Sequence, residues 1–268
     1  MADYQTLLVS HTAGVLTATL NRPDRLNALN DSMAAELIAL VRQATRDASV
    51  RVLVITGAGK GFCAGQDLNA MLEHSDGQPI SFKQHLEVGF HPLISALRSL
   101  EKPVITAING AAAGAGLGLA LAGDLRLAAT TAKFRTAFIG IGLVPDSGVS
   151  YFLPRLIGPA RAAHMLLTND PISAEQAEQW GLVNQTLPPD DLLPATQALA
   201  ARLAAGPAQA LGLTKRALNR ALLTDLDSAL NYEAQLQEIA GHGADFAEGV
   251  AAFLEKRTPC FAGSPDKE

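Results

Sequence analysis

Short apolar runs recur through the first two thirds of the chain, and their length and β-branched residues predict buried strands. They span residues 6–10, 14–20, 50–56, 103–109 and 125–129. After the second run, Asn30 can cap a helix whose apolar positions repeat at helical spacing from Met33 to Ala44. Strands that alternate with helices favour parallel pairing in βαβ units, so this region is expected to form an α/β core.

Two segments depart from this alternation. Residues 73–92 are polar and predict a loop that runs into a helix through Leu86, Phe90 and Leu97. From residue 173 onward nearly every signal is helical. We therefore divide the chain into an α/β core, residues 1–200, and a C-terminal helical region rich in Leu and Ala, residues 201–268. Such a region can mediate self-association or pack on its own core.

Composition narrows the functional classes. The chain has 268 residues, of which 48% are hydrophobic, but it has no apolar run of about 18 residues, so no membrane-spanning helix is expected. Its first residues lack the basic and apolar segments of a signal peptide. The net charge of −5 argues against nucleic acid as a partner. Cys63 and Cys260 stand apart from any motif, which is typical of a reducing cytoplasm.

Several common catalytic motifs are missing. The loop at residues 57–61 is glycine-rich, but it is not part of a P-loop, and Phe62 and Leu119 occupy the third glycine positions of the two Gly-x-Gly-x-x-Gly candidates. The six histidines are scattered without a His-Glu-x-x-His pair, so no metal site is expected. Ser147 lacks the flanking glycines of a nucleophile elbow.

Two strand–loop units remain as candidates, residues 61–68 and residues 109–118. In the second unit, small residues follow a strand and open a helix, so a ligand can approach the backbone. The first amides of a helix lack intrahelical partners and lie at its positive end. The loop after Gly65 can supply another free amide. Two convergent amides form an oxyanion hole for a carbonyl oxygen; close helix–strand packing without a ligand is the alternative.

The order of the motifs resembles that of a known family. Six blocks are similar, in sequence and spacing, to signature blocks of the enoyl-CoA hydratase/isomerase (crotonase) family: residues 21–23, 62–68, 109–116, 142–146, 172–183 and 248–257. The resemblance covers nearly the whole chain. It implies an α/β fold, a spiral of ββα and βαβ turns, followed by a C-terminal helical region that builds trimers, often paired as hexamers.

The resemblance also implies a set of site residues for an acyl-CoA thioester. The backbone amides of Gln66 and Ala115 would form the oxyanion hole, with no role for the Gln66 side chain. Residues expected near the CoA moiety are Arg25, Leu26, Ala28, Ala64, Asp67, Leu68, Phe253 and Lys256. The last two could come from a neighbouring subunit. Alternatively, Phe253 is a core residue and Lys256 a solvated charge. CoA is part of the substrate, so no separate cofactor is expected.

The chain departs from the hydratase pattern of two glutamates. Gly118 and Phe138 stand at those positions, and neither can transfer a proton. Their replacement predicts a drier, more apolar pocket, and Tyr151 is a further candidate for its lining. Asp146 is the acid that remains in a suitable block, either as the general base or as a helix N-cap. Asp124 is a second acid, interpreted as structural because it resembles a residue found across the family.

Within the family, this combination is similar to the isomerases that convert 2-(1,2-epoxy-1,2-dihydrophenyl)acetyl-CoA to an oxepin-CoA in phenylacetate degradation. That similarity implies an isomerase that works through an enolate and can also shift enoyl-CoA double bonds. Two alternatives stay open: a hydratase that uses Asp146 alone, and a non-catalytic acyl-CoA-binding protein.

Overall fold

A computed structural model describes residues 4–73 and 81–261. Its larger sheet has six strands in the order β1-β2-β3-β5-β7-β10. Their bounds are Leu7–Thr12, Val15–Leu20, Val52–Gly57, Val104–Ile108, Leu125–Ala129 and Gln185–Leu187. Strand β1 pairs antiparallel with β2, and the remaining neighbours pair in parallel. The mixed α/β architecture, built around a parallel sheet, confirms the predicted fold class.

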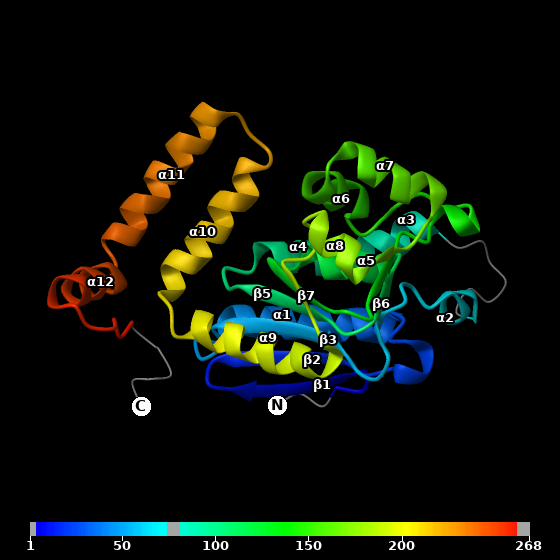
Figure 1. The fold of residues 1–268 in the computed structure, drawn as a ribbon, viewed down its shortest axis with the longest axis horizontal. Helices are drawn as coiled ribbons and strands as arrows, with labels where there is room; N and C mark the ends of the chain where they lie inside the picture. The colour runs from blue at the N-terminus through cyan, green and yellow to red at the C-terminus, as the bar shows by residue number, and fades with distance from the viewer. Residues whose placement is uncertain (1–3, 74–80, 262–268) are drawn as a thin grey trace.

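The central strands of the larger sheet, β2, β3, β5 and β7, are buried on both faces, as their nearly continuous apolar sequences require. In β3, Leu53 and Ile55 face a core that contains α1 (Asp31–Arg46) and α4 (His91–Ser99). Val52 and Val54 face the opposite core, beneath α9 (Pro189–Ala204). The side-chain period of two along a strand divides these residues between the two layers. Figure 1 shows α9 running across the sheet, where it packs against β2, β3, β5 and β7.

A second sheet, in the order β4-β6-β8-β9, carries the candidate loops. Its strands are Gly61–Cys63, Ala111–Ala113, Lys133–Arg135 and Ile172–Ser173, and the first three pair in parallel. The small residues after Asn109 open helix α5 (Ala115–Ala122) as predicted, but strand β6 comes before it. This strand was not predicted because a run of alanines has no strand signal of its own, and pairing with β4 and β8 fixes its conformation.

The segment before α4 is helical but not regular. After α2 (Leu68–Glu73) and residues outside the described part of the chain, α3 (Phe82–His85) leads into a π-helical turn, η2 (Leu86–Phe90), and then into α4. The predicted helix through Leu86 and Leu97 is therefore confirmed, with a change of helical period inside it. Phe90 and Leu97 are buried against the core despite this change.

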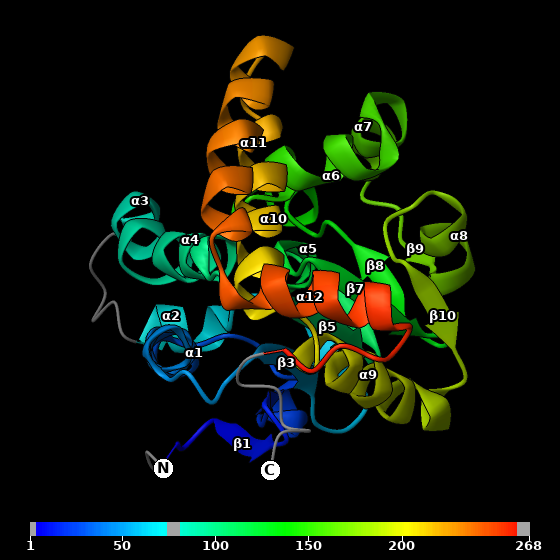
Figure 2. The ribbon, with the colours of Figure 1, turned by 90° about the vertical axis from the view of Figure 1, so that its left-hand side faces the viewer.

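Beyond the second sheet lie α6 (Val149–Ile157), α7 (Pro159–Thr168) and α8 (Ala174–Gln179). The chain then passes through α9, which contains residue 200, into α10 (Ala208–Ala221), α11 (Leu226–Gly241) and α12 (Ala244–Glu255). Figures 1 and 2 show α10 and α11 as an antiparallel pair that projects from the core, with α12 at the end of α11 that lies away from the turn joining the pair. We call α10–α12 the helical arm.

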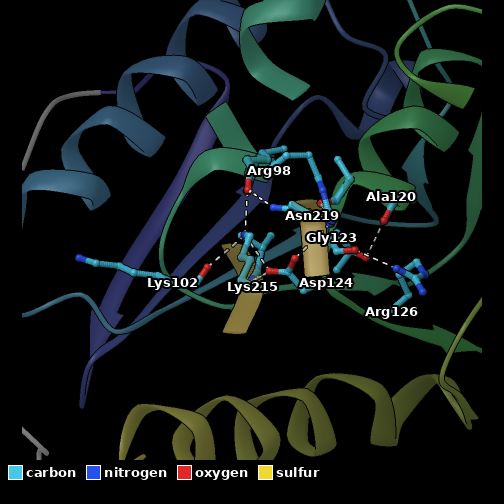
Figure 3. Close-up of polar contacts among 12 residues, drawn as sticks. Arg98, Lys102, Ala120, Gly123, Asp124, Arg126, Lys215 and Asn219 are labelled. Carbon is cyan, nitrogen blue, oxygen red and sulfur yellow. Dashed lines mark hydrogen bonds and ion pairs between the residues drawn. The ribbon is translucent and has the colours of Figure 1, made fainter. Parts of the chain in front are cut away.

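A buried polar cluster ties the arm to the core, and Figure 3 shows its members. Lys215 of α10 lies 2.7 Å from one carboxylate oxygen of Asp124, and Arg98 of α4 lies 3.1 Å from the other. Lys215 also donates to the carbonyls of Leu97 and Lys102. The Val104 amide donates to Asp124 at 2.9 Å. We call Arg98, Asp124 and Lys215, with these backbone partners, the Asp124 cluster.

Candidate active site

The loops after β4 and β6 converge because the two strands are parallel neighbours, so both chains leave the sheet at the same edge. Gly65 and Gly114 form the contact between them. A Cβ on Gly65 would lie 2.9 Å from the carbonyl oxygen of Ala113 and 3.6 Å from the amide nitrogen of Ala115. Both glycines have positive φ, +102° and +52°, which side chains of other residues rarely adopt. The close approach therefore depends on glycine at both positions.

Two backbone amides at this contact have free N–H groups. The chain around Gln66 is fixed by hydrogen bonds from Leu29 to Gly65 and from Asp67 to Leu29. Ala115 is the first residue of α5, where an amide has no intrahelical partner. Within the described residues, neither Gln66 nor Ala115 donates a backbone hydrogen bond. Two free amides on adjoining loops are the kind of group that can bind a carbonyl oxygen on which negative charge develops.

Asp146 lies in a turn that packs against α5. A Cβ on Gly118 would lie only 2.5 Å from the carbonyl oxygen of Ser147, so any larger residue there would displace the turn. Gly118 was expected to line an open apolar pocket, but the space above it is filled by the backbone of Ser147. That expectation was incomplete, since Gly118 also makes room for the Asp146 turn.

The side chain of Asp146 does not cap α6. That helix, fully described here, has Gly148 at its N-cap and no side-chain cap hydrogen bond. The carboxylate instead accepts a hydrogen bond from the Ser147 hydroxyl at 2.8 Å, while the backbone carbonyl of Asp146 accepts from Val149. The N-cap interpretation of this side chain is therefore wrong, and its carboxylate remains available for chemistry.

Burial raises the pKa of Asp146 above its ordinary value of 3.8, because desolvation disfavours the charged carboxylate. The Ser147 hydrogen bond and the charges of His91 and His85 act in the opposite direction but do not cancel the effect of burial. The two histidines were not singled out from the sequence, since they belong to no motif. Phe138, 6% exposed, belongs to the adjoining core and supplies no acid.

The loop predicted to contact CoA lies beside the first of the two strand–loop units. Ala64 donates to the Leu26 carbonyl, and the buried side chain of Asn27 donates to the carbonyl of Gly61. This contact brings together most of the expected CoA residues. Of these, Arg25, Leu26 and Leu68 are exposed, Ala64 is half-buried, and Ala28 and Asp67 are buried.

Asp67 is held within the protein. Its carboxylate lies 2.7 Å from Arg22 and accepts a hydrogen bond from the Ala70 amide in the first turn of α2. Burial alone would raise the pKa of Asp67, but these hydrogen bonds and the charges of Arg22 and Arg25 lower it overall. The ion pair fastens the loop before α1 to the loop that carries Gln66.

Three expected site residues lie away from this contact. Phe253 is 82% exposed on α12, so the interpretation of Phe253 as a core residue is wrong for the single chain. Lys256 follows it at the exposed C-cap of the same helix. Figure 1 shows α12 and α2 at opposite ends of the molecule, so the chain's own arm does not reach Gln66. Tyr151 lines a cavity of about 500 Å³ together with Arg98 and Tyr232.

The other acid, Asp124, is occupied in the Asp124 cluster by two cations and a backbone amide. This arrangement is consistent with its structural interpretation. Among residues 4–73 and 81–261, no group of His, Cys, Asp and Glu side chains could hold a metal ion. No helix in the same ranges combines the length and apolarity needed to cross a membrane.

Comparisons with known proteins agree with this geometry. The family model described as enoyl-CoA hydratase/isomerase matches residues 10–264. The chain is 47% identical to the 1,2-epoxyphenylacetyl-CoA isomerase of Escherichia coli (strain K12), over 96% of this chain and 98% of that protein. It is 36% identical to the crotonyl-CoA hydratase of Syntrophomonas wolfei, over 96% and 98%.

A solved structure with a similar fold is the enoyl-CoA hydratase of Bacillus anthracis. Its TM-score is 0.91 at 35% identity, and the match covers 97% of this chain and all of that one. Sequence, fold and the convergence of the two glycine loops lead to the same assignment. The chain belongs to the enoyl-CoA hydratase/isomerase family.

Proposed function

We propose that this chain is an acyl-CoA isomerase that works through an enolate, with Asp146 as its general base. One observation carries the proposal. A carboxylate with a raised pKa lies in a turn packed against α5, whose first amide is free, and its side chain has no capping role. A base and an oxyanion hole are the two elements that enolate formation requires.

The proposed reaction moves a proton between two carbon atoms. The Asp146 carboxylate removes a proton from the carbon next to the thioester carbonyl. The electron pair of that C–H bond shifts toward the carbonyl oxygen, where the amides of Gln66 and Ala115 stabilise the negative charge. The protonated Asp146 then returns the proton at a different carbon, so the product is an isomer of the substrate. No cofactor enters this sequence.

The substrate we favour is 2-(1,2-epoxy-1,2-dihydrophenyl)acetyl-CoA, with an oxepin-CoA as the product. In that substrate the C–C bond shared by the epoxide and the six-membered ring also opens, and its electron pair becomes part of the double bonds of the seven-membered ring. A shift of an enoyl-CoA double bond needs the two proton transfers alone. The 47% identity with the Escherichia coli isomerase supports this choice. Phe138 supports it as well, because an apolar aromatic side chain can pack against a ring but cannot hold a water in position.

Hydration is the second candidate, favoured by the similarity to a crotonyl-CoA hydratase. It needs a water held by an acid and a base, and the two positions expected to supply them hold Gly118 and Phe138. A third possibility is a protein that binds acyl-CoA without turnover. The free Asp146 carboxylate argues against it, since a pure binding site gains nothing from a desolvated acid.

We also propose that the arm mediates self-association into a trimer or hexamer. It exposes many large apolar side chains that the single chain leaves uncovered: Leu218, Leu223, Leu226, Leu230, Phe246, Phe253 and Leu254. A patch of this kind marks an interaction surface. In such an assembly, Phe253 and Lys256 would be offered to the CoA site of a neighbouring copy. A stable monomer at micromolar concentration in sedimentation would contradict this proposal.

A substrate panel tests the reaction. The purified protein is incubated with ring-epoxide, 3-enoyl and 2-enoyl CoA esters, and products are identified by mass and absorbance. Isomerisation leaves the mass unchanged, whereas hydration adds one water and removes the absorbance of the conjugated thioester. Isomers from the epoxide or 3-enoyl esters support the proposal. Hydration of crotonyl-CoA without isomerisation, or binding without any product, would overturn it.

A further inference from the structure

His85 connects three elements around the oxyanion loop. It is the last residue of α3, and its side chain is 18% exposed. Its Nε2 atom contacts the carboxamide nitrogen of Gln66. Its Nδ1 atom lies 3.6 Å from a carboxylate oxygen of Asp31, the first residue of α1. The imidazole ring also packs against Phe90, with ring centroids 5.4 Å apart.

Gln66 is therefore held at both ends. Its backbone is fixed by the pairing with Leu29, and its carboxamide is fixed by His85 and by the Met71 sulfur at 3.2 Å. A cavity of about 110 Å³ lies beside it, between α2 and the N-terminus of α1. That space would let the carboxamide turn away if His85 did not hold it.

The hydrogen-bond roles follow from the neighbours. Only the tautomer with its proton on Nδ1 leaves Nε2 as an acceptor for the Gln66 amide, and that proton then lies on the side of Asp31. The chain Asp31–His85–Gln66 thus links the start of α1 and the end of α3 to the loop that carries the oxyanion amide. The family resemblance required only the backbone of Gln66, and it gave His85 no role.

We propose that His85 is a positioning residue, which orients the Gln66 backbone amide toward the thioester oxygen by holding the Gln66 carboxamide. The inference rests on the proposed oxyanion hole but not on the identity of the base. Its physical basis is that a donor displaced by a fraction of an ångström from a developing charge loses much of its effect.

Steady-state kinetics provide the first test. His85→Phe keeps an aromatic ring beside Phe90 but removes the acceptor. We expect kcat to fall about 10-fold, in line with the cost of small misplacements, with KM nearly unchanged. His85→Gln, which can still accept a hydrogen bond, should recover much of the loss. His164→Phe is the matched control, because His164 is an exposed histidine of α7. Equal losses in the His85→Phe and His85→Gln variants would overturn the proposal.

A double-mutant cycle tests whether His85 acts through Gln66. If it does, the loss of kcat caused by His85→Phe disappears in a Gln66→Leu background, since the contact between His85 and the Gln66 carboxamide is already absent. Additive losses would overturn the proposal. A pH–rate profile of His85→Phe that loses a whole limb would also overturn it, because His85 would then transfer protons itself.

Vibrational spectroscopy separates this inference from the proposed function. The carbonyl stretch of bound butyryl-CoA, isotopically labelled at the thioester carbon, reports polarisation by the oxyanion hole without turnover. We expect the frequency shift of this stretch on binding to be smaller in His85→Phe than in the wild type and to be retained in Asp146→Asn. If the shift weakened in His85→Phe while Asp146→Asn kept full activity, Asp146 would be refuted as the base but His85 would keep its positioning role. A wild-type shift in His85→Phe would refute the positioning role alone.

Discussion

Two aspartates stand at opposite parts of α5, and their surroundings differ in kind. Asp124, just beyond the C-terminal end of the helix, receives two cations and a backbone amide. Asp146, in the turn packed against Gly118, accepts a hydrogen bond from the Ser147 hydroxyl and has a raised pKa. The same residue type is thus an anchor where cations neutralise its charge, and it has the raised pKa expected of the proposed general base where burial outweighs the nearby hydrogen bond and charges.

This contrast also separates stability from chemistry. The Asp124 cluster fastens the arm to the core, so disrupting it should lower the free energy of unfolding. In the proposed mechanism the Asp146 turn supplies the general base, so substitution of Asp146 should lower turnover. Substitution of Asp124 should therefore lower stability with little effect on turnover, and substitution of Asp146 should lower turnover with little effect on stability.

Asp146→Asn should have the largest effect. Asparagine keeps the shape of the side chain and its bond to Ser147, but it cannot accept the substrate proton. We expect kcat to fall about 10²–10⁴-fold, the usual contribution of general acid–base catalysis, with acyl-CoA affinity retained. Steady-state kinetics and equilibrium binding check this. Near-wild-type isomerisation would show that the base lies elsewhere.

Ala115→Pro should have the next largest effect. Proline lacks an amide hydrogen, yet it is well tolerated at the first position of a helix, so α5 should still form. We expect a loss of about 10²–10³ in kcat, as for other single oxyanion donors. Circular dichroism verifies the fold, and Ala115→Ser, which retains the amide, is the control. Full activity in a folded Ala115→Pro variant would remove this amide from the site.

Asp124→Asn should lower stability and leave turnover nearly unchanged, unlike the two substitutions above. It leaves the positive charge of Lys215, whose side chain is 7% exposed, without its anionic partner. We expect the free energy of unfolding to drop by about 3 kcal/mol, near the lower end for a broken buried ion pair because Asp124 is partly exposed. Chemical denaturation measures this. Adding Lys215→Met should recover part of the loss, and kcat of the folded fraction should be little changed.

The smallest effect is the pH dependence at Asp146. Because its folded pKa is raised, kcat should fall on acidification at a higher pH than an ordinary aspartate would cause. The folded state also binds this proton more tightly than the unfolded state does. The stability linked to Asp146 is therefore present below the unfolded pKa and lost as pH rises through the folded pKa. Asp146→Asn should thus be at least as stable as wild type at pH 7. Lower stability there would indicate a structural role.

The sequence predicted the regular parts of the fold because local patterns encode them. β3 and β5 are nearly continuous apolar runs, β7 is apolar except for Arg126, and Asn30 caps α1 through the Met33 amide as expected. β6 and the π-helical turn were not predicted, since three alanines and one extra residue in a helical turn carry no local signal. Their conformations come from neighbouring strands and from the packing of Phe90.

The candidate site divides in the same way. The ordered motif blocks alone identified the family, and they predicted roles for the two amides and Asp146, because each lies within a contiguous stretch of sequence. Only the tertiary structure decided that Gly118 makes room for the Asp146 turn, that Asp124 is occupied by Arg98 and Lys215, and that His85 meets Gln66. These contacts join residues 19 to 91 positions apart. Burial and charge compensation act through space, so a residue's chemistry is settled by neighbours that the sequence does not place beside it.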